Sequence, residues 1–314
     1  MMQTAAAIRR KSLRRSIKVQ FLNHWQLYLM MIPAVAYIII FAYVPMYGIL
    51  MAFKDFSLKK GILGSPWCGV SNFVRLFKSY WFPVILKNTL SVSLLSLVIG
   101  FPIPILFALM VNEVGNGKVK QVLQTVSYAP HFISTVVICG MILLFLSPST
   151  GIINLAIQAL GMEPVYFMAS PTAFKWVYVL SGVWQGTGWG AIIYFAALAG
   201  VDKSLLEAAE IDGATRIQRI IHINFPVLVP TIVIMLILQC GQLLSVGYEK
   251  VLLLQNDSNL SGSEVISTYV YKVGLVDFDY AFSTASGIFN SICNTVILVA
   301  ANTLSKKFAN SSLW

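Results

Sequence analysis

Long apolar runs constrain this chain more than any other feature of its sequence. Several stretches reach the roughly 20 residues that an α-helix needs to cross a hydrocarbon layer about 30 Å thick. The 314 residues are 57% hydrophobic and only 11% charged, whereas about a quarter of a typical soluble domain is charged. Transmembrane β-barrels have short alternating segments instead, and none is seen here. The sequence therefore predicts an all-α, polytopic membrane protein.

Six apolar runs are bounded by charged residues or by Pro and Gly clusters, and they predict six transmembrane helices. We place these helices near residues 27–50, 86–111, 122–146, 175–199, 227–249 and 284–305. Between them, the run GIINLAIQALG predicts a short amphipathic helix on the outer surface, and QNDSNLSGSE predicts a loop. We expect a basic arm, a six-helix transmembrane domain and a tail, at residues 1–25, 26–305 and 306–314.

The distribution of Lys and Arg predicts the orientation in the membrane. An even number of helices places both termini on one side, and 13 of the 22 basic residues lie on that side, six of them within the first 18 residues. Because cytoplasmic segments carry such an excess, we expect both termini in the cytoplasm, with the arm near anionic lipid headgroups. The basic residues are not gathered on a soluble module with interleaved aromatics, so no nucleic-acid partner is expected.

One polar segment interrupts the apolar pattern, with seven charged side chains between residues 202 and 219. Good helix formers run from Leu205 to Asp212, Gly213 tolerates a left-handed turn, and helical periodicity resumes at Ala214. The segment therefore predicts a helix-turn-helix knob on the cytoplasmic side, in which Asp212 caps the second helix. Apolar residues recur through it, so we expect part of it to be buried, against either the membrane core or a partner protein.

The same segment carries a recognisable motif. Its residues resemble the EAA loop of binding-protein-dependent ABC importer permeases, E-A-A-x-x-x-G followed after nine residues by I-x-L-P; the matching positions are Glu207, Ala208, Ala209, Gly213, Ile223 and Pro226. Phe225 replaces the family Leu, one bulky apolar residue for another. The runs IDGAT and WQGTGWG resemble the carbohydrate branch, which includes permeases for maltose, alginate oligosaccharides and aldouronates. The resemblance covers about residues 25–305.

The resemblance implies a type I ABC importer permease in a prokaryotic cell membrane. Residues 203–226 would then form a coupling loop whose first helix enters a cleft of a separate ATPase. Glu207 would meet a basic side chain there, unless it is only a solvated carboxylate. Ala208 and Ala209 would allow close approach, and Asp212, Gly213, Ile223 and Pro226 would shape the rest of the loop. The implied partners are a second, different permease, two ATPase subunits, an external solute-binding protein, an oligosaccharide and the lipid bilayer.

No catalytic centre is predicted in this chain. The phosphate-binding motif G-x-x-x-x-G-K-[ST] is missing, since GNGKVK at residues 115–120 has neither the spacing nor the following Ser or Thr. The three histidines are scattered, and the four cysteines show no metal-ligand spacing. We therefore expect no cofactor here, with ATP and Mg²⁺ held by the partner ATPase, and we expect the chain not to be an enzyme.

Polar groups inside two predicted helices suggest where a solute passes. Such groups usually face a bundle interior or a water-filled cavity. In the first helix, helical spacing places one set on a single face: Gly182, Gln185, Gly186 and Trp189. In the second, polar residues recur every third position: Gln239, Gln242 and Ser245. Amides near an indole suit sugar hydroxyls and the apolar face of a pyranose. We predict a substrate site at Gln185, Gly186, Trp189, Gln239, Gln242 and Thr135.

Alternatives remain at this point. The amides equally suit hydrogen bonds between helices, and Glu249 suits an interfacial carboxylate near the outer end of its helix. A second hypothesis keeps the same family but changes the solute to a peptide, an amino acid or an inorganic anion. A channel or scaffold without ATP coupling is the competing class, and it lacks a stoichiometric ATPase companion. Basic residues on the outer side weakly favour an acidic saccharide.

Overall fold

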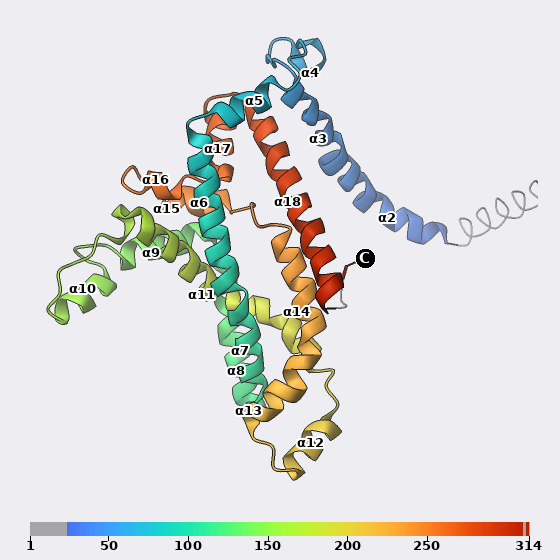
Figure 1. Cartoon of the computed structure of the whole chain (residues 1–314), viewed down its shortest axis with the longest axis vertical. Helices are drawn as coiled ribbons and strands as arrows, with labels where there is room; N and C mark the ends of the chain where they lie inside the picture. The colour runs from blue at the N-terminus through green and yellow to red at the C-terminus, as the bar shows by residue number, and fades with distance from the viewer. Residues whose placement is uncertain (1–23, 310–311, 314) are drawn as a thin grey trace, which may run out of the picture.

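The computed structural model describes residues 24–309, 312 and 313, and these residues are almost entirely helical (Figure 1). Four helical segments are long and apolar enough to cross a membrane, and the number rises to six if each of two bent helix pairs forms one span. The four segments overlap the predicted runs at residues 27–50, 86–111, 227–249 and 284–305, and the two bent pairs overlap the runs at 122–146 and 175–199. The expected basic arm lies almost wholly outside the described residues.

The elements are labelled in chain order. Those of the amino-terminal half are α2 (Trp25–Ile38), η1 (Ile39–Tyr43), α3 (Val44–Met46), η2 (Tyr47–Phe53), α4 (Gly61–Gly64), α5 (Ser71–Lys78), α6 (Trp81–Leu95), η3 (Ser96–Gly100), α7 (Pro102–Asn112), α8 (Gly117–Tyr128), η4 (Ala129–Phe132), α9 (Thr135–Phe145) and α10 (Ile152–Ala159). Those that follow are η5 (Phe167–Ala169), α11 (Pro171–Leu198), α12 (Lys203–Ile211), α13 (Arg216–Arg219), η6 (Ile220–Asn224), α14 (Phe225–Cys240), α15 (Tyr248–Leu254), α16 (Leu260–Ser263), α17 (Ile266–Tyr271), η7 (Lys272–Val276) and α18 (Tyr280–Ala309).

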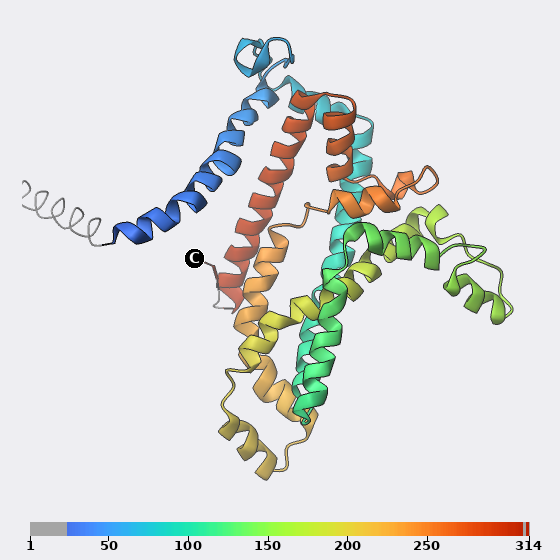
Figure 2. The same ribbon diagram turned by 180° about the vertical axis from the view of Figure 1, so that it is seen from behind.

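The molecule is elongated, with its long helices running roughly along one direction (Figure 1). At one end of the long axis α12 projects from the bundle, and α4 and α5 lie at the opposite end. Both views show α2 diverging from α18 along its length, and α10 standing out to the side (Figure 2). The predicted short helix in GIINLAIQALG is present as α10.

The third predicted helix, at residues 122–146, is wrong as a single element. The structure divides it into the segment Gly117–Phe132 and α9, which meet at 96°. Pro130 lacks an N–H and cannot continue the hydrogen-bond ladder of α8, and the chain passes into the short 3-10 helix η4. Ile133 and Ser134 are then extended, and the Ser134 hydroxyl caps α9 by accepting from the Val137 N–H at 3.4 Å.

The fifth predicted helix, at residues 227–249, ends too late. The helix stops at Cys240, because Asn294 on α18 accepts a hydrogen bond from the Leu244 backbone N–H at 2.9 Å. Leu298 on α18 packs so closely on Gly241 that a Cβ there would lie 2.8 Å from its Cδ1. Gln242 and Ser245 therefore lie on a turn beyond α14 rather than on one helix face with Gln239.

The predicted loop QNDSNLSGSE is present apart from the four-residue helix α16, but its polar residues are partly buried rather than solvated. Asn256 and Asn259 exchange hydrogen bonds between side chain and backbone at 3.1 and 3.0 Å, and both amides donate to the Met168 carbonyl. Glu264, only 3% exposed, binds Lys272 at 2.5 Å and accepts from Thr268 at 2.8 Å. Internal partners thus replace water, and α15 to α17 form a packed insertion between α14 and α18.

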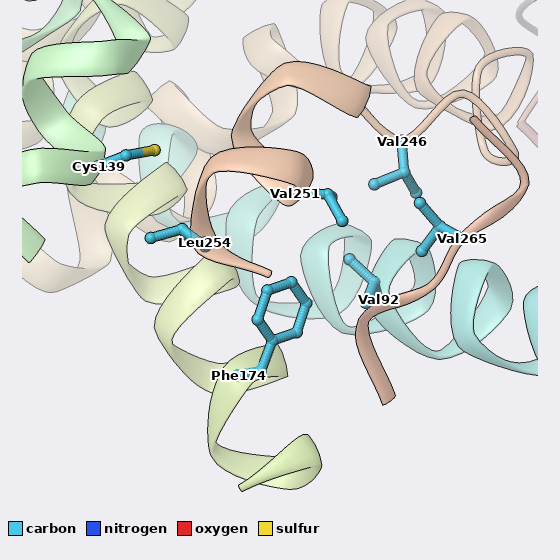
Figure 3. Packing of buried hydrophobic residues seen from close by; sticks show 7 residues of the cluster. All are labelled: Val92, Cys139, Phe174, Val246, Val251, Leu254 and Val265. Atoms are coloured by element: carbon cyan, nitrogen blue, oxygen red, sulfur yellow. The ribbon is translucent and has the colours of Figure 1, made fainter. Parts of the chain in front are cut away.

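Two apolar clusters hold the bundle together. The first surrounds α15 and consists of Val92, Cys139, Phe174, Val246, Val251, Leu254 and Val265 (Figure 3). The second joins α7, α11 and α14 and consists of Ile105, Ala108, Leu109, Ala191, Tyr194, Leu198 and Leu228. The α18 helix continues past residue 305, so Lys306 and Lys307 belong to its last turn rather than to a separate tail.

Candidate functional site

The polar segment forms the predicted helix-turn-helix knob. The first helix, α12, begins after Asp202, whose side chain accepts from the Ser204 N–H at 2.9 Å, and this hydrogen bond lowers the pKa of the carboxyl. Gly213 makes the turn with a φ of +80°, a left-handed conformation that residues with a Cβ rarely adopt. Asp212 does not cap the second helix as predicted. Thr215 is closer to the start of α13 and caps it, in a reciprocal capping box with Gln218.

The knob is exposed although it contains large apolar side chains. None of the α12 residues is buried. Leu205, Ile211 and Ile217 are 57%, 87% and 68% exposed. Of the two surfaces considered from the sequence, the membrane core of this chain does not cover the apolar residues of α12. They are available to a partner.

The structure gathers part of the EAA motif around one hollow. A cavity of about 310 Å³ between α12 and α13 is lined by eight residues, Ala209, Asp212, Gly213, Ala214, Gln218, Arg219, His222 and Ile223. Glu207 and Ala208 lie outside this lining, on an exposed part of α12. Pro226 lies in the first turn of α14, directly after the π-helical turn η6 within the continuous helix Arg216–Cys240.

An ionic cluster that the sequence did not predict ties the knob to the bundle. Arg219, at the end of α13, binds Glu210 of α12 at 2.9 Å and Glu113 at 3.3 Å. Glu113 ends α7, and its other carboxylate oxygen accepts from the Asn224 amide at 2.9 Å. No sequence pattern pairs these groups, because Arg219 and Glu113 are 106 positions apart.

A larger cavity lies inside the bundle, with a volume of about 480 Å³. It is lined by η3, α7, α11, α14 and α15, through residues that include Ser96, Pro104, Tyr178, Gly182, Gln185, Gly186, Tyr194, Met235, Gln239 and Lys250. A smaller cavity of about 160 Å³ shares part of this lining and adds Gln242 and Ser245. Hydroxyl, amide and aromatic groups therefore face one continuous region of the interior.

The structure brings together some of the predicted substrate residues and separates others. Gln185, Gly186 and Gln239 line the larger cavity, and Gln242 lines the smaller one. Trp189 lines neither cavity; its ring stacks on His131, with centroids 4.3 Å apart and planes within 4°. Thr135 lines neither cavity and starts α9. The Gln185 amide donates to the Ile133 carbonyl at 3.3 Å, so it also supports the break before α9.

Lys250 is a cavity residue that sequence reasoning missed. Its Nζ donates to the Tyr178 carbonyl at 3.1 Å and lies 4.9 Å from the centre of the Tyr178 ring. Lys250 also lies beside Gly182, where an added Cβ would be 3.5 Å from Nζ, an ordinary van der Waals distance. Among the described residues no carboxylate forms an ion pair with Lys250. A cationic group without a fixed counterion thus faces the interior cavity.

The residues that the structure describes contain no cluster of three or more His, Cys, Asp or Glu side chains able to hold a metal ion. The chemistry of the site is that of hydrogen bonding, aromatic contact and one ammonium group. Together with the apolar helices and the exposed knob, this defines a multi-pass membrane protein with an internal polar cavity, the class of a transport permease.

The chain belongs to the family of binding-protein-dependent transport system inner membrane components, whose sequence profile matches residues 100–310. The family resemblance inferred from the EAA motif is therefore confirmed. As a permease component the chain is not an enzyme, and ATP hydrolysis belongs to a separate subunit. It is a multi-pass protein of the inner membrane.

Relatives and solved structures agree with this assignment. The chain is 40% identical over 309 residues to the polygalacturonan/rhamnogalacturonan transport system permease YteP of Bacillus subtilis, covering 98% of this chain and 96% of that protein. It is 39% identical to LplB of the same organism, covering 92% and 91%. A crystal structure of a bacterial ABC transporter that imports the acidic polysaccharide alginate matches with a TM-score of 0.85 and 41% identity, over 93% of this chain and 99% of that one. The predicted type I ABC permease fold is confirmed.

Proposed function

We propose that this chain is a permease subunit of an ATP-driven importer that moves an oligosaccharide delivered by an external solute-binding protein. The family membership supports the transport class. A second structure of the alginate transporter, in complex with a periplasmic protein bound to alginate pentasaccharide, supports the mode of delivery; its TM-score is 0.85 at 40% identity. The relatives described above whose printed names give a solute transport polysaccharides, which supports a sugar over the other solutes considered.

The proposed assembly contains a second, different permease and two ATPase subunits, which hold ATP and Mg²⁺. The complex lies in the cell membrane of a prokaryote, with both termini and the knob in the cytoplasm. In this arrangement the knob at the end of the long axis meets the ATPase (Figure 1). Rocking of the bundle around the interior cavity then exposes the solute to one side at a time.

The observation that carries the coupling role is the exposure of α12. The apolar side chains of Leu205 and Ile211 face water in this chain, and burying them against a partner stabilises the assembly by the hydrophobic effect. The small side chains of Ala208 and Ala209 allow the ATPase to approach this part of α12 closely. Glu207 then supplies the charged contact with a basic side chain of the ATPase.

We predict that Glu207→Ala abolishes uptake and solute-stimulated ATP hydrolysis while leaving insertion of the chain in the membrane intact. Insertion is expected to be intact because Glu207 is exposed, so its replacement removes no contact needed for folding. Vesicles containing the complete importer measure both activities, and Lys203→Ala on the same exposed helix is the matched control. Normal uptake by Glu207→Ala would reject the coupling assignment. A complex that copurifies without any ATPase would favour a channel or scaffold instead.

We further propose that the carried oligosaccharide is acidic, with uronic-acid units. Lys250 supports this class, because an ammonium that faces the cavity without a carboxylate partner is suited to a carboxylate of the solute. Gln185 and Gln239 on the same lining suit sugar hydroxyls, which need both donors and acceptors. Polygalacturonan and alginate, named for the relatives above, are polymers of this chemical class.

We predict that Lys250→Met lowers uptake of oligogalacturonate by about 10-fold or more, since hydrogen bonds to charged groups contribute about 1.5–3 kcal/mol. Uptake of a neutral oligosaccharide of equal length is expected to be unchanged or improved. Lys250→Arg keeps the charge and is expected to retain part of the uptake, and exposed Lys59→Met is the control for loss of a distant charge. Equal losses for acidic and neutral solutes would contradict the acidic class.

A further inference from the structure

We infer that Arg219 is a positioning residue that transmits movement of α12 to the transmembrane bundle through Glu210 on one side and Glu113 on the other. The inference rests on the proposed docking role of α12. It adds a defined path between the docking helix and the helices that line the interior cavity.

The geometry places Arg219 between two carboxylates that belong to different parts of the chain. One guanidinium nitrogen, Nη1, lies 2.9 Å from Glu210 Oε1, and the other, Nη2, lies 3.3 Å from Glu113 Oε2. A planar guanidinium presents its donors in a fixed fork, so one side chain bridges both groups without changing its own conformation. Lys lacks this fork and holds a single point charge.

The bundle end of this link is fixed. The Arg219 and Glu113 side chains are only 14% and 13% exposed. Glu113 has a second partner, because Asn224, fully buried in η6, donates to its Oε1 at 2.9 Å. Both carboxylate oxygens of Glu113 are therefore engaged, and the group cannot turn to follow Arg219 without breaking one of these bonds.

Glu113 directly follows a helix that belongs to the second apolar cluster. It ends α7, and Ile105, Ala108 and Leu109 of that helix belong to the apolar cluster shared with α11 and α14. The same three helices line the interior cavity. A displacement of Glu113 along its helix axis is thus a displacement of a cavity wall.

The knob end of the link is the opposite case, since α12 has little else to hold it. The helix buries no residue, and the turn that follows it depends on a left-handed Gly213. Glu210 is itself 71% exposed. Without the Glu210 contact, α12 is connected to the bundle through its two flanking turns and is free to tilt without moving α7.

The test is a double-mutant cycle on the complete importer, using Glu113→Gln and Glu210→Gln singly and together. The first readout is oligogalacturonate uptake per ATP hydrolysed in vesicles. The second is hydrogen exchange of the α12 backbone in the purified complex, which needs no solute. We expect each single variant to lower uptake per ATP by about 5-fold or more, the lower end of typical couplings between sites. Because the two contacts act in series, the double variant is expected to be no worse than the poorer single variant.

Independent contributions would instead multiply in the double variant, and that result overturns the inference. Arg219→Lys is expected to retain less than half of the wild-type uptake per ATP hydrolysed. Arg216→Gln, at an exposed position on the same short helix, is expected to behave as wild type. Basal ATP hydrolysis stays unchanged in every variant, which separates a positioning role from a loss of assembly. Since Glu210 is mostly exposed, Glu210→Gln folds normally even if Glu113→Gln does not.

Failure of this inference is distinguishable from failure of the proposed function. If Glu207→Ala blocks transport while the three carboxylate variants are normal, α12 docks but Arg219 transmits nothing. If Glu207→Ala is also normal, the docking role itself is wrong. If hydrogen exchange of α12 is equal in Glu210→Gln and wild type, the ion pair does not hold the helix, and the inference is rejected without any solute.

Discussion

Gly213 shows at the residue scale how one backbone conformation shapes the knob. Space does not require glycine here, because a Cβ added at this position would meet no atom within 4 Å. The left-handed φ of +80° is therefore what favours glycine. We predict that Gly213→Asn keeps most uptake, whereas Gly213→Val lowers it by about 10-fold, since a left-handed conformation costs about 1–2 kcal/mol for residues other than glycine and asparagine. Uptake and copurified ATPase measure the effect. Equal activity of the two variants would mean that the turn does not fix the direction of α12.

Single residues were predictable where the sequence showed a polar group inside an apolar run. Gln185 and Gln239 stood out for that reason, and both line the cavity. Trp189 was placed on the same face by helical spacing, but its stacking on His131 takes its ring away from the lining. Lys250 was counted only as an outer-side charge, because no pattern showed that the chain turns inward after Cys240.

At the element scale, two ion pairs offer a direct comparison. Lys272 binds Glu264, whose side chain is 4% exposed, whereas the side chains of Arg75 and Asp279, which also form an ion pair, are 58% and 27% exposed. We predict that Lys272→Met lowers the unfolding free energy by about 3 kcal/mol, because it leaves a buried carboxylate without its counterion. Arg75→Met is the matched control and is expected to cost less than about 1 kcal/mol. Thermal unfolding in detergent measures both, and equal shifts would contradict the role of burial.

Helices were predicted well as apolar runs and poorly at their breaks. The break before α9 has a local cause in Pro130 and was readable in principle, but the apolar composition continues across it. The end of α14 has no local cause, since Asn294 and Leu298 act on it from α18. The insertion of α15 to α17 was missed for the same reason, because its amides and hydroxyls find partners within the fold that composition alone does not reveal.

For the whole molecule, hydropathy and one motif were sufficient to predict the class. Four apolar runs correspond to long helical segments and two to bent helix pairs. The EAA motif predicted the family that the match over residues 100–310 confirms. The relation between the two ends was not predictable. A knob at one end and a cavity inside the bundle are joined by contacts between α7, α11 and α13, and these contacts depend on packing rather than on sequence spacing.

The bare surface of the knob, formed by α12 and α13, also affects how such a protein is produced. Leu205, Ile211 and Ile217 face water in a chain that has met no partner. Exposed apolar groups of this kind promote aggregation and attract the proteases and chaperones that remove unassembled proteins. With the docking role proposed above, we expect a cell that makes this chain in excess of its ATPase to lose the surplus. The proposed docking surface would then also set how many copies of the permease survive.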